Sequence, residues 1–104
     1  ESVKWYRAAA EQGYTDAQFN LGFSYKKGRG VPKDYVQAHK WFNLSTVSTD
    51  LDKEDKEAAV TLRDDLAENM TREQIAEAQR LATAWEPKTW EVIRKELKIG
   101  ESND

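Results

Sequence analysis

The stretch "KKGRGVPKDY" at residues 26–35 places three cations and two glycines ahead of a proline. Such a segment could cradle a phosphate, bind nucleic acid, or only form a turn. A Walker-type phosphate loop needs Gly-x4-Gly-Lys-Ser/Thr between a strand and a helix, so that backbone N–H groups converge on the phosphate. Neither that spacing nor a strand is present. We therefore predict a turn between two packed helices, with contact between its cations and an anionic partner as the alternative.

Ser24 and Lys27 have the Ser-x-x-Lys spacing, which can supply a nucleophile and its activating amine in penicillin-interacting enzymes. The companion motifs are absent, because residues 88–90 read Lys-Thr-Trp where Lys-Thr-Gly is needed. Ser24 also falls late in a predicted helix whose apolar face points elsewhere. We interpret the spacing as chance and predict no catalytic residue. An enzyme acting on cell-wall or penicillin-like substrates is the disfavoured alternative.

Two features could suggest a metal. His39 is the only histidine, and it has no partners at ligand spacing and no nucleophile or carboxylate for a catalytic dyad. The acidic run at 50–57 begins like an EF-hand loop, but Asp55 stands where the glycine is needed and Thr61 where the bidentate glutamate is needed. We predict an apolar packing position for His39, a solvated helix start for the acidic run, and neither a metal nor a cofactor.

Composition limits the function classes. The chain has 38% hydrophobic, 34% charged and 11% aromatic residues, which is too aromatic for a disordered protein. Its net charge of -3 argues against nucleic acid, which normally requires a basic face. No apolar run approaches the roughly 20 residues that cross a bilayer, so we expect a soluble chain without membrane insertion. The sequence has no cysteine and hence no disulfide framework. The compartment stays open between bacterial periplasm and cytoplasm, and so does the oligomeric state.

Apolar residues recur at helical spacing along the whole chain, and no segment alternates as a strand would. We predict helices at 2–12, 16–27, 35–46, 53–69, 72–86 and 89–98. Three capping boxes are expected at helix starts: Thr15 with Gln18, Asp34 with Gln37, and Thr71 with Gln74. Gly28 is expected to end one helix in the left-handed conformation. The fold class is all-α.

The chain also repeats itself. Lys4-Trp5-Tyr6 and Lys40-Trp41-Phe42 lie 36 residues apart (41 − 5), a period typical of helical solenoids. A fainter echo at offset 41 relates residues 17–25 to residues 58–66. We predict one repeat domain with four parts: the end of a preceding repeat (1–13), a full repeat (14–48), a degenerate repeat (49–70) and C-terminal capping helices (71–99). Trp5 and Trp41 should lie in the core, and Trp85 and Trp90, which flank Pro87, should cover its end.

The fixed spacings from Ala17-x3-Leu21-Gly22 through the two-glycine turn to Trp41-Phe42 resemble the Sel-one-like repeat family, short α/α relatives of the tetratricopeptide repeat. The resemblance implies a right-handed α/α solenoid that binds proteins or peptides, often as an adaptor in bacteria. It also implies that the first helices of the pairs line a concave face. Gly22 in mid-helix costs about 1 kcal/mol in propensity relative to alanine, which predicts close approach of the neighbouring helix backbone.

A binding face follows by elimination. Ala17, Leu21 and Tyr25 should point inward, which leaves a polar row on the same helix and its counterparts at offset 41. The predicted partner-binding residues are Asn20, Phe23, Ser24, Lys27, Thr61, Asp65 and Glu68, with Phe23 as the apolar anchor. We predict a protein-interaction module that binds a protein or peptide there. A purely structural cap, with the binding surface in repeats upstream of Glu1, is the main alternative.

Overall fold

The structure is a computed structural model that describes residues 2–48 and 51–97. All regular secondary structure in these ranges is helical, without a strand, so the predicted all-α class is confirmed. The described helices are α1 (Ser2–Glu11), α2 (Thr15–Lys27), α3 (Tyr35–Thr46), α4 (Lys53–Ala67), α5 (Arg72–Ala84) and α6 (Trp90–Leu97).

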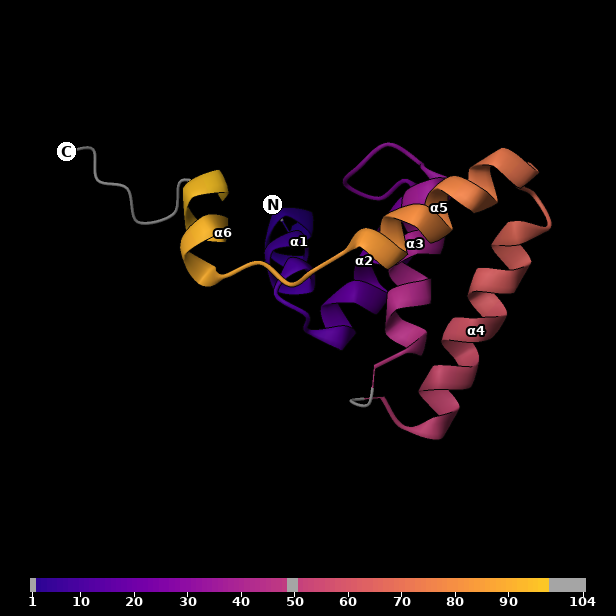
Figure 1. Cartoon of the computed structure of the whole chain (residues 1–104), viewed down its shortest axis with the longest axis horizontal. Coiled ribbons are helices and arrows are strands. Elements are labelled where there is room, and N and C mark those ends of the chain that lie inside the picture. The colour runs from indigo at the N-terminus through magenta and orange to yellow at the C-terminus, as the bar shows by residue number, and fades with distance from the viewer. Residues whose placement is uncertain (1, 49–50, 98–104) are drawn as a thin grey trace.

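The helices from α1 to α4 pack one on the next, and α5 packs on α3 (Figure 1). α2 lies between α1 and α3, and α3 in turn packs against α4 and α5. The segment after α5 returns along α1, where the Lys88 ammonium lies 3.1 Å from a carboxylate oxygen of Glu11, and it leads to α6 beside α1. The molecule is elongated, with extents of 49 × 28 × 24 Å. This arrangement agrees with a helical repeat solenoid, while its right-handed sense and the C-terminal cap stay predictions.

Three helix starts are capped by side chains, as helix termini require for their free N–H groups. The Asp34 carboxylate accepts a hydrogen bond from the Gln37 backbone N–H at the start of α3. At α5, Thr71 and Gln74 form the complete reciprocal capping box. Asp52 caps α4 by accepting from the N–H of Asp55, which confirms the acidic run as a helix start.

The capping box predicted at Thr15 is wrong. α2 begins at Thr15 itself, and Tyr14 precedes it without a side-chain cap. The two side chains serve tertiary contacts instead: the Thr15 hydroxyl lies 2.6 Å from the Ser48 hydroxyl, and the Gln18 amide donates to the Ala10 carbonyl at 3.1 Å. Both residues are buried, so packing between helices overrides the local capping pattern here.

The ends of the helices follow from glycine and proline. Gly28 ends α2 with φ 71°, and its N–H donates to the Ser24 carbonyl, as predicted. α5 ends at Ala84, earlier than the predicted residue 86, because Trp85 already adopts an extended conformation. Pro87 also disfavours the helical conformation for Glu86, the residue before it.

The core lies mainly between α2 and α3. Leu21, Ala38, Trp41 and Phe42 are at most 2% exposed, and the inward direction predicted for Ala17 and Tyr25 is confirmed. A Cβ added at Gly22 would lie 2.7 Å from the Phe42 ring. The close approach predicted at Gly22 therefore exists, but it is made by an aromatic side chain and not by helix backbone.

The two repeat-related tryptophans have different fates. Trp41 is buried and packs edge-to-face on Trp85 with ring centroids 6.4 Å apart. Trp5 is 54% exposed, so its predicted core position is wrong. α1 packs against α2 on one side and touches α6 on another, and no described helix covers the face that carries Trp5. The side chain of Trp90 lies outside the described residues.

Candidate functional site

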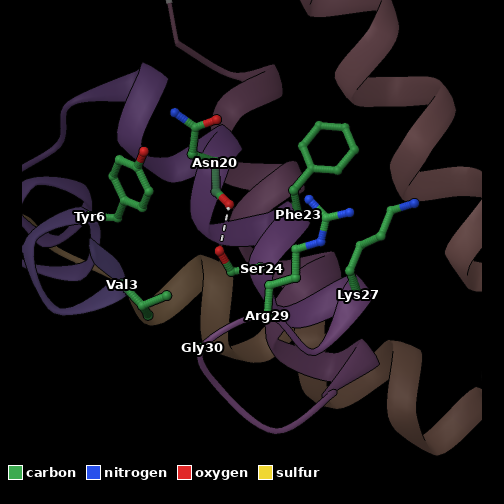
Figure 2. Close-up of a pocket in the computed structure, with 8 residues that line it drawn as sticks. All are labelled: Val3, Tyr6, Asn20, Phe23, Ser24, Lys27, Arg29 and Gly30. Atoms are coloured by element: carbon green, nitrogen blue, oxygen red, sulfur yellow. Dashed lines mark hydrogen bonds between the residues drawn. The ribbon is translucent and has the colours of Figure 1, made fainter. Parts of the chain in front are cut away.

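A groove of about 520 Å³ lies where α1, α2 and the turn after α2 meet (Figure 2). Four residues of the predicted row on α2 line it: Asn20, Phe23, Ser24 and Lys27. The other lining residues are Val3 and Tyr6 of α1 and Arg29 and Gly30 of the turn. A volume of this size is within the range typical of ligand sites, roughly 300 to 1,000 Å³.

Two glycines set the shape of the groove at the turn. Gly28 and Gly30 have φ values of 71° and 77°, which residues with a side chain rarely adopt. Arg29 lies between these two glycines. A Cβ at Gly30 would lie 2.6 Å from Val3 Cγ2, so the missing side chain lets α1 pack directly against the turn. The segment "KKGRGVP" is thus confirmed as a turn, and it also forms one end of the groove.

An aromatic cluster fixes Phe23. Its ring packs edge-to-face on Phe19 and Phe42 with centroid distances of 5.1 and 5.4 Å. Such pairs contribute about 0.5–1.5 kcal/mol beyond area burial. Phe23 nevertheless stays only half-buried and keeps part of its ring on the groove. Tyr6, which is 40% exposed, stands on the other side of Asn20 and Ser24 in Figure 2.

The groove carries positive charge at one end. Lys27 and Arg29 are exposed, and neither pairs with a carboxylate in the part of the chain that the structure describes. In Figure 2 both cationic groups extend on the Phe23 side of the groove. Lys26 adds a third cation, with its ammonium 6.0 Å from the centre of the Phe23 ring. Among the residues that the structure describes, no acidic one lines the groove.

Ser24 differs from the prediction in exposure. It is only 9% exposed, and its hydroxyl donates to the Asn20 carbonyl at 3.2 Å within the same helix. The hydroxyl therefore satisfies a local backbone acceptor, while Lys27 one turn later is directed to solvent. The Ser-x-x-Lys spacing brings these residues to the same groove without a hydrogen bond between the two side chains.

The predicted second half of the row is elsewhere. Thr61, Asp65 and Glu68 are exposed on α4 and at its C-terminal end, and none of them lines the groove. α4 packs on α3, with the Arg63 guanidinium donating to the Asn43 amide oxygen at 2.9 Å. The structure therefore brings together the α2 row with α1, and it leaves the α4 row as a separate polar surface.

Sequence reasoning missed Val3 and Tyr6 as groove residues. Their spacing of three puts both on one face of α1, and Gly30 signals a close neighbour, but the sequence does not state that the neighbour is Val3. Arg29 was considered only as part of a basic turn. The partner helix of α2 in the groove is the preceding helix and not its counterpart in the next pair.

The remaining chemical candidates occupy structural positions. His39 is 3% exposed, as predicted, and burial together with the nearby Arg63 charge lowers its pKa, against an opposing effect of Asp64. Burial likewise lowers the pKa of Lys40, whose ammonium lies 4.3 Å from the Trp41 ring centre. Within the described ranges, no three His, Asp or Glu residues lie close enough to hold a metal ion. None of the described helices is long and apolar enough to cross a membrane.

Paired helices, left-handed glycines in the connecting turn and a lateral groove define the chain as a helical repeat protein of the α/α class. Its sequence matches the Sel1 repeat at residues 1–14 and again at 15–46. Residues 1–46 therefore consist of Sel1 repeats, the Sel-one-like repeats inferred above. Sel1 repeats generally mediate protein interactions and are typically not catalytic. No curated protein and no solved structure matches the chain.

Proposed function

We propose that this chain is a protein-interaction module that binds a protein or peptide in the groove between α1 and α2. The observation that carries the proposal is the convergence of Asn20, Phe23 and Lys27 on one groove with Tyr6 of the neighbouring helix. Aromatic residues fixed in a half-open pocket are the typical anchors of protein interfaces. The α4 row of Thr61, Asp65 and Glu68, which forms a separate polar surface, is proposed as a second contact surface for the same partner.

The proposed module performs no catalysis. The best nucleophile candidate, the Ser24 hydroxyl, donates to a backbone carbonyl and makes no hydrogen bond to Lys27 or to another side-chain base among the described residues. His39 is buried away from the groove residues and pairs with none of them. An oriented nucleophile and base would be required for the acyl transfer that a cell-wall or penicillin-like substrate needs.

The test compares proteins captured from the source lysate by three forms of the 104-residue chain. The first is the natural chain, and the second carries Asn20→Glu, Lys27→Glu and Arg29→Glu. The third form, the α4 variant, carries Thr61→Glu, Asp65→Lys and Glu68→Lys and tests the second surface. All six substitutions must leave helicity intact by circular dichroism. Ser24 is kept because a carboxylate at this buried position would be desolvated.

The groove would be supported by a protein that the natural chain and the α4 variant capture and that the groove variant loses. Loss by both variants would support contact at both surfaces. Equal capture by all three forms would overturn a site at either surface. Capture of nothing by the natural chain would favour the structural alternative, in which this piece ends a repeat array and does not itself bind.

A further inference from the structure

The groove offers a partner an unusual combination of groups. Its cationic end has Lys27 and Arg29, its middle has Asn20, and its walls have the rings of Tyr6 and Phe23 (Figure 2). The chain as a whole carries a net charge of -3, so this concentration of cations runs against its overall charge. A local field of this kind attracts partners of opposite sign and repels those of the same sign.

From this we infer the chemical class of the partner: the groove binds an acidic peptide segment that carries one aromatic or large aliphatic side chain. The inference rests on the proposed function and adds the chemistry of recognition. The apolar side chain would lie on Phe23 and Tyr6, and the carboxylates of its neighbours would face Lys27 and Arg29.

Charge complementarity is the first reason. Lys27 and Arg29 have no carboxylate partner among the described residues, and no acidic residue lines the groove to compete for them. By contrast, Lys88 and Arg80 pair with Glu11 and Glu77. The cations of the groove are thus available to carboxylates from another molecule.

The rigidity of the site is the second reason. The Phe23 ring is fixed by Phe19 and Phe42, and Arg29 sits between two left-handed glycines that define the backbone on either side. The Gly30 contact with Val3 holds the turn against α1. A preorganised site loses less conformational entropy when a flexible peptide binds.

An oligonucleotide is the other macromolecule that uses cations and aromatic rings together. The groove itself has two exposed cations, and the chain as a whole carries a net charge of -3, whereas a nucleic-acid site normally requires an extended basic face to contact successive phosphates. A short acidic peptide segment has no such requirement, because its charge ends with the segment. The observations therefore favour the peptide.

The experiment measures binding of dye-labelled peptides to the 104-residue chain by fluorescence polarisation. The probe has one phenylalanine between short runs of glutamate, with both ends blocked. One control peptide replaces the glutamates by lysines, and a second replaces the phenylalanine by alanine. A single-stranded oligonucleotide with the same dye is the fourth ligand.

We expect the phenylalanine–glutamate peptide to bind more tightly than each of the three control ligands and to weaken as salt is added. Lys27→Gln with Arg29→Gln should weaken it about three- to tenfold, because exposed ion pairs are screened by solvent and contribute modestly. Lys33→Gln, a cation of the same turn that does not line the groove, is the matched control and should bind as the natural chain does.

The inference is overturned if the lysine or alanine peptide, or the oligonucleotide, binds as tightly as the probe, if the probe does not bind, or if Lys33→Gln has the same effect as the groove pair. Its failure is distinct from failure of the proposed function. A lysate partner that the groove variant loses, together with no binding of the probe, would keep the groove as a site and reject the acidic class. The groove itself would be rejected if no lysate partner depended on it and the probe peptide did not bind.

Discussion

α2 and α3 pack directly on each other, whereas α4 and α5, which are helices of similar length, each pack on α3 and bury far fewer residues. The buried residues of α2 and α3 include Leu21, Trp41 and Phe42, whereas α4 buries only Ala59 and Leu66 and α5 only Ala78. Side chains cap the starts of α3, α4 and α5 alike. The family match covers α2 and α3 and does not reach α4 or α5. The repeat pattern in the sequence therefore indicates tight packing between helices, and not only the presence of helices.

The position of Gly22 illustrates the difference. The Phe42 ring of α3 enters the space that a side chain at Gly22 would fill. At offset 41 the corresponding residue of α4 is Arg63, whose guanidinium reaches α3 by a hydrogen bond to Asn43 and also contacts Asp64 at 3.1 Å. α2 and α3 are joined by apolar interlocking, whereas α3 and α4 are joined, at this point, by a polar contact that water can replace.

The largest expected effect uses two leucines that the repeat relates. Leu21→Ala should lower the free energy of unfolding by about 3 kcal/mol, because Leu21 is fully buried and its loss leaves a cavity. Leu62→Ala removes the same atoms from a half-buried position, where solvent and neighbours can fill the space, and should cost about 1 kcal/mol. Urea denaturation of the three proteins measures both changes.

Helicity and tryptophan fluorescence should be followed together in that experiment. Coincident transitions would justify comparing the two leucines on one scale. Equal losses for the two variants would contradict this contrast in packing. Two separate transitions would sharpen it, with Leu62→Ala moving only the earlier one.

Much of this fold could be predicted, because local signals decide helices and their ends. The helix ends follow from single residues: Gly28 ends α2, and the side chains of Asp34, Asp52 and Thr71 accept hydrogen bonds from free backbone N–H groups at the starts of α3, α4 and α5. Thr15 could not be predicted in this way. Its hydroxyl is used by Ser48, a residue far along the chain, and only the packed structure brings the two together.

The groove was predictable in part for the same reason. Helical periodicity predicted that Asn20, Phe23 and Lys27 lie on one face of α2, and in the structure all three line the groove. Periodicity does not tell which helix lies opposite that face. The repeat relation suggested α4, whereas α1 and the turn complete the groove, because Gly30 allows Val3 to approach. The exposure of Trp5 has a similar cause, since a repeat position predicts burial only where a neighbouring helix covers it.

The second prediction tests the interlocking directly. Gly22→Ala should destabilise the chain by about 1–3 kcal/mol, because the new Cβ would lie 2.7 Å from the Phe42 ring and force it to move. Helix propensity alone would favour alanine by about 1 kcal/mol, so the sign separates the two effects. Asn20→Ala, at an exposed position of the same helix, is the control and should change stability by less than about 0.5 kcal/mol.

A double variant makes this conclusion specific. Phe42→Leu removes the ring that occupies the space, so Gly22→Ala should cost much less in the Phe42→Leu background than in the natural chain. Additive losses would show that the alanine acts through another contact. A stabilising Gly22→Ala would mean that the ring shifts without penalty and that α2 and α3 are less tightly interlocked than their geometry indicates.

The smallest expected effect concerns the contact between α3 and α4, where His39 of α3 lies near Arg63 and Asp64 of α4. Burial and the Arg63 charge lower the pKa of His39 below its usual 6.5. The unfolded chain therefore binds a proton at a higher pH than the folded chain does. The contribution of His39 to stability is complete above about pH 6.5 and is lost as the pH falls from there through the lower folded pKa.

Urea denaturation between about pH 7.5 and pH 5 should consequently show a decline in stability for the natural chain and a flatter profile for His39→Gln, in which no imidazole titrates. Carboxylates titrate mainly below this window, near pH 4, so they contribute little to the difference. Arg63→Gln removes the repulsive charge and should leave an intermediate slope, because burial alone would then lower the pKa. Parallel profiles for the natural chain and His39→Gln would mean that water reaches the imidazole in solution, and that the α3–α4 contact opens more readily than the interlocked α2–α3 pair.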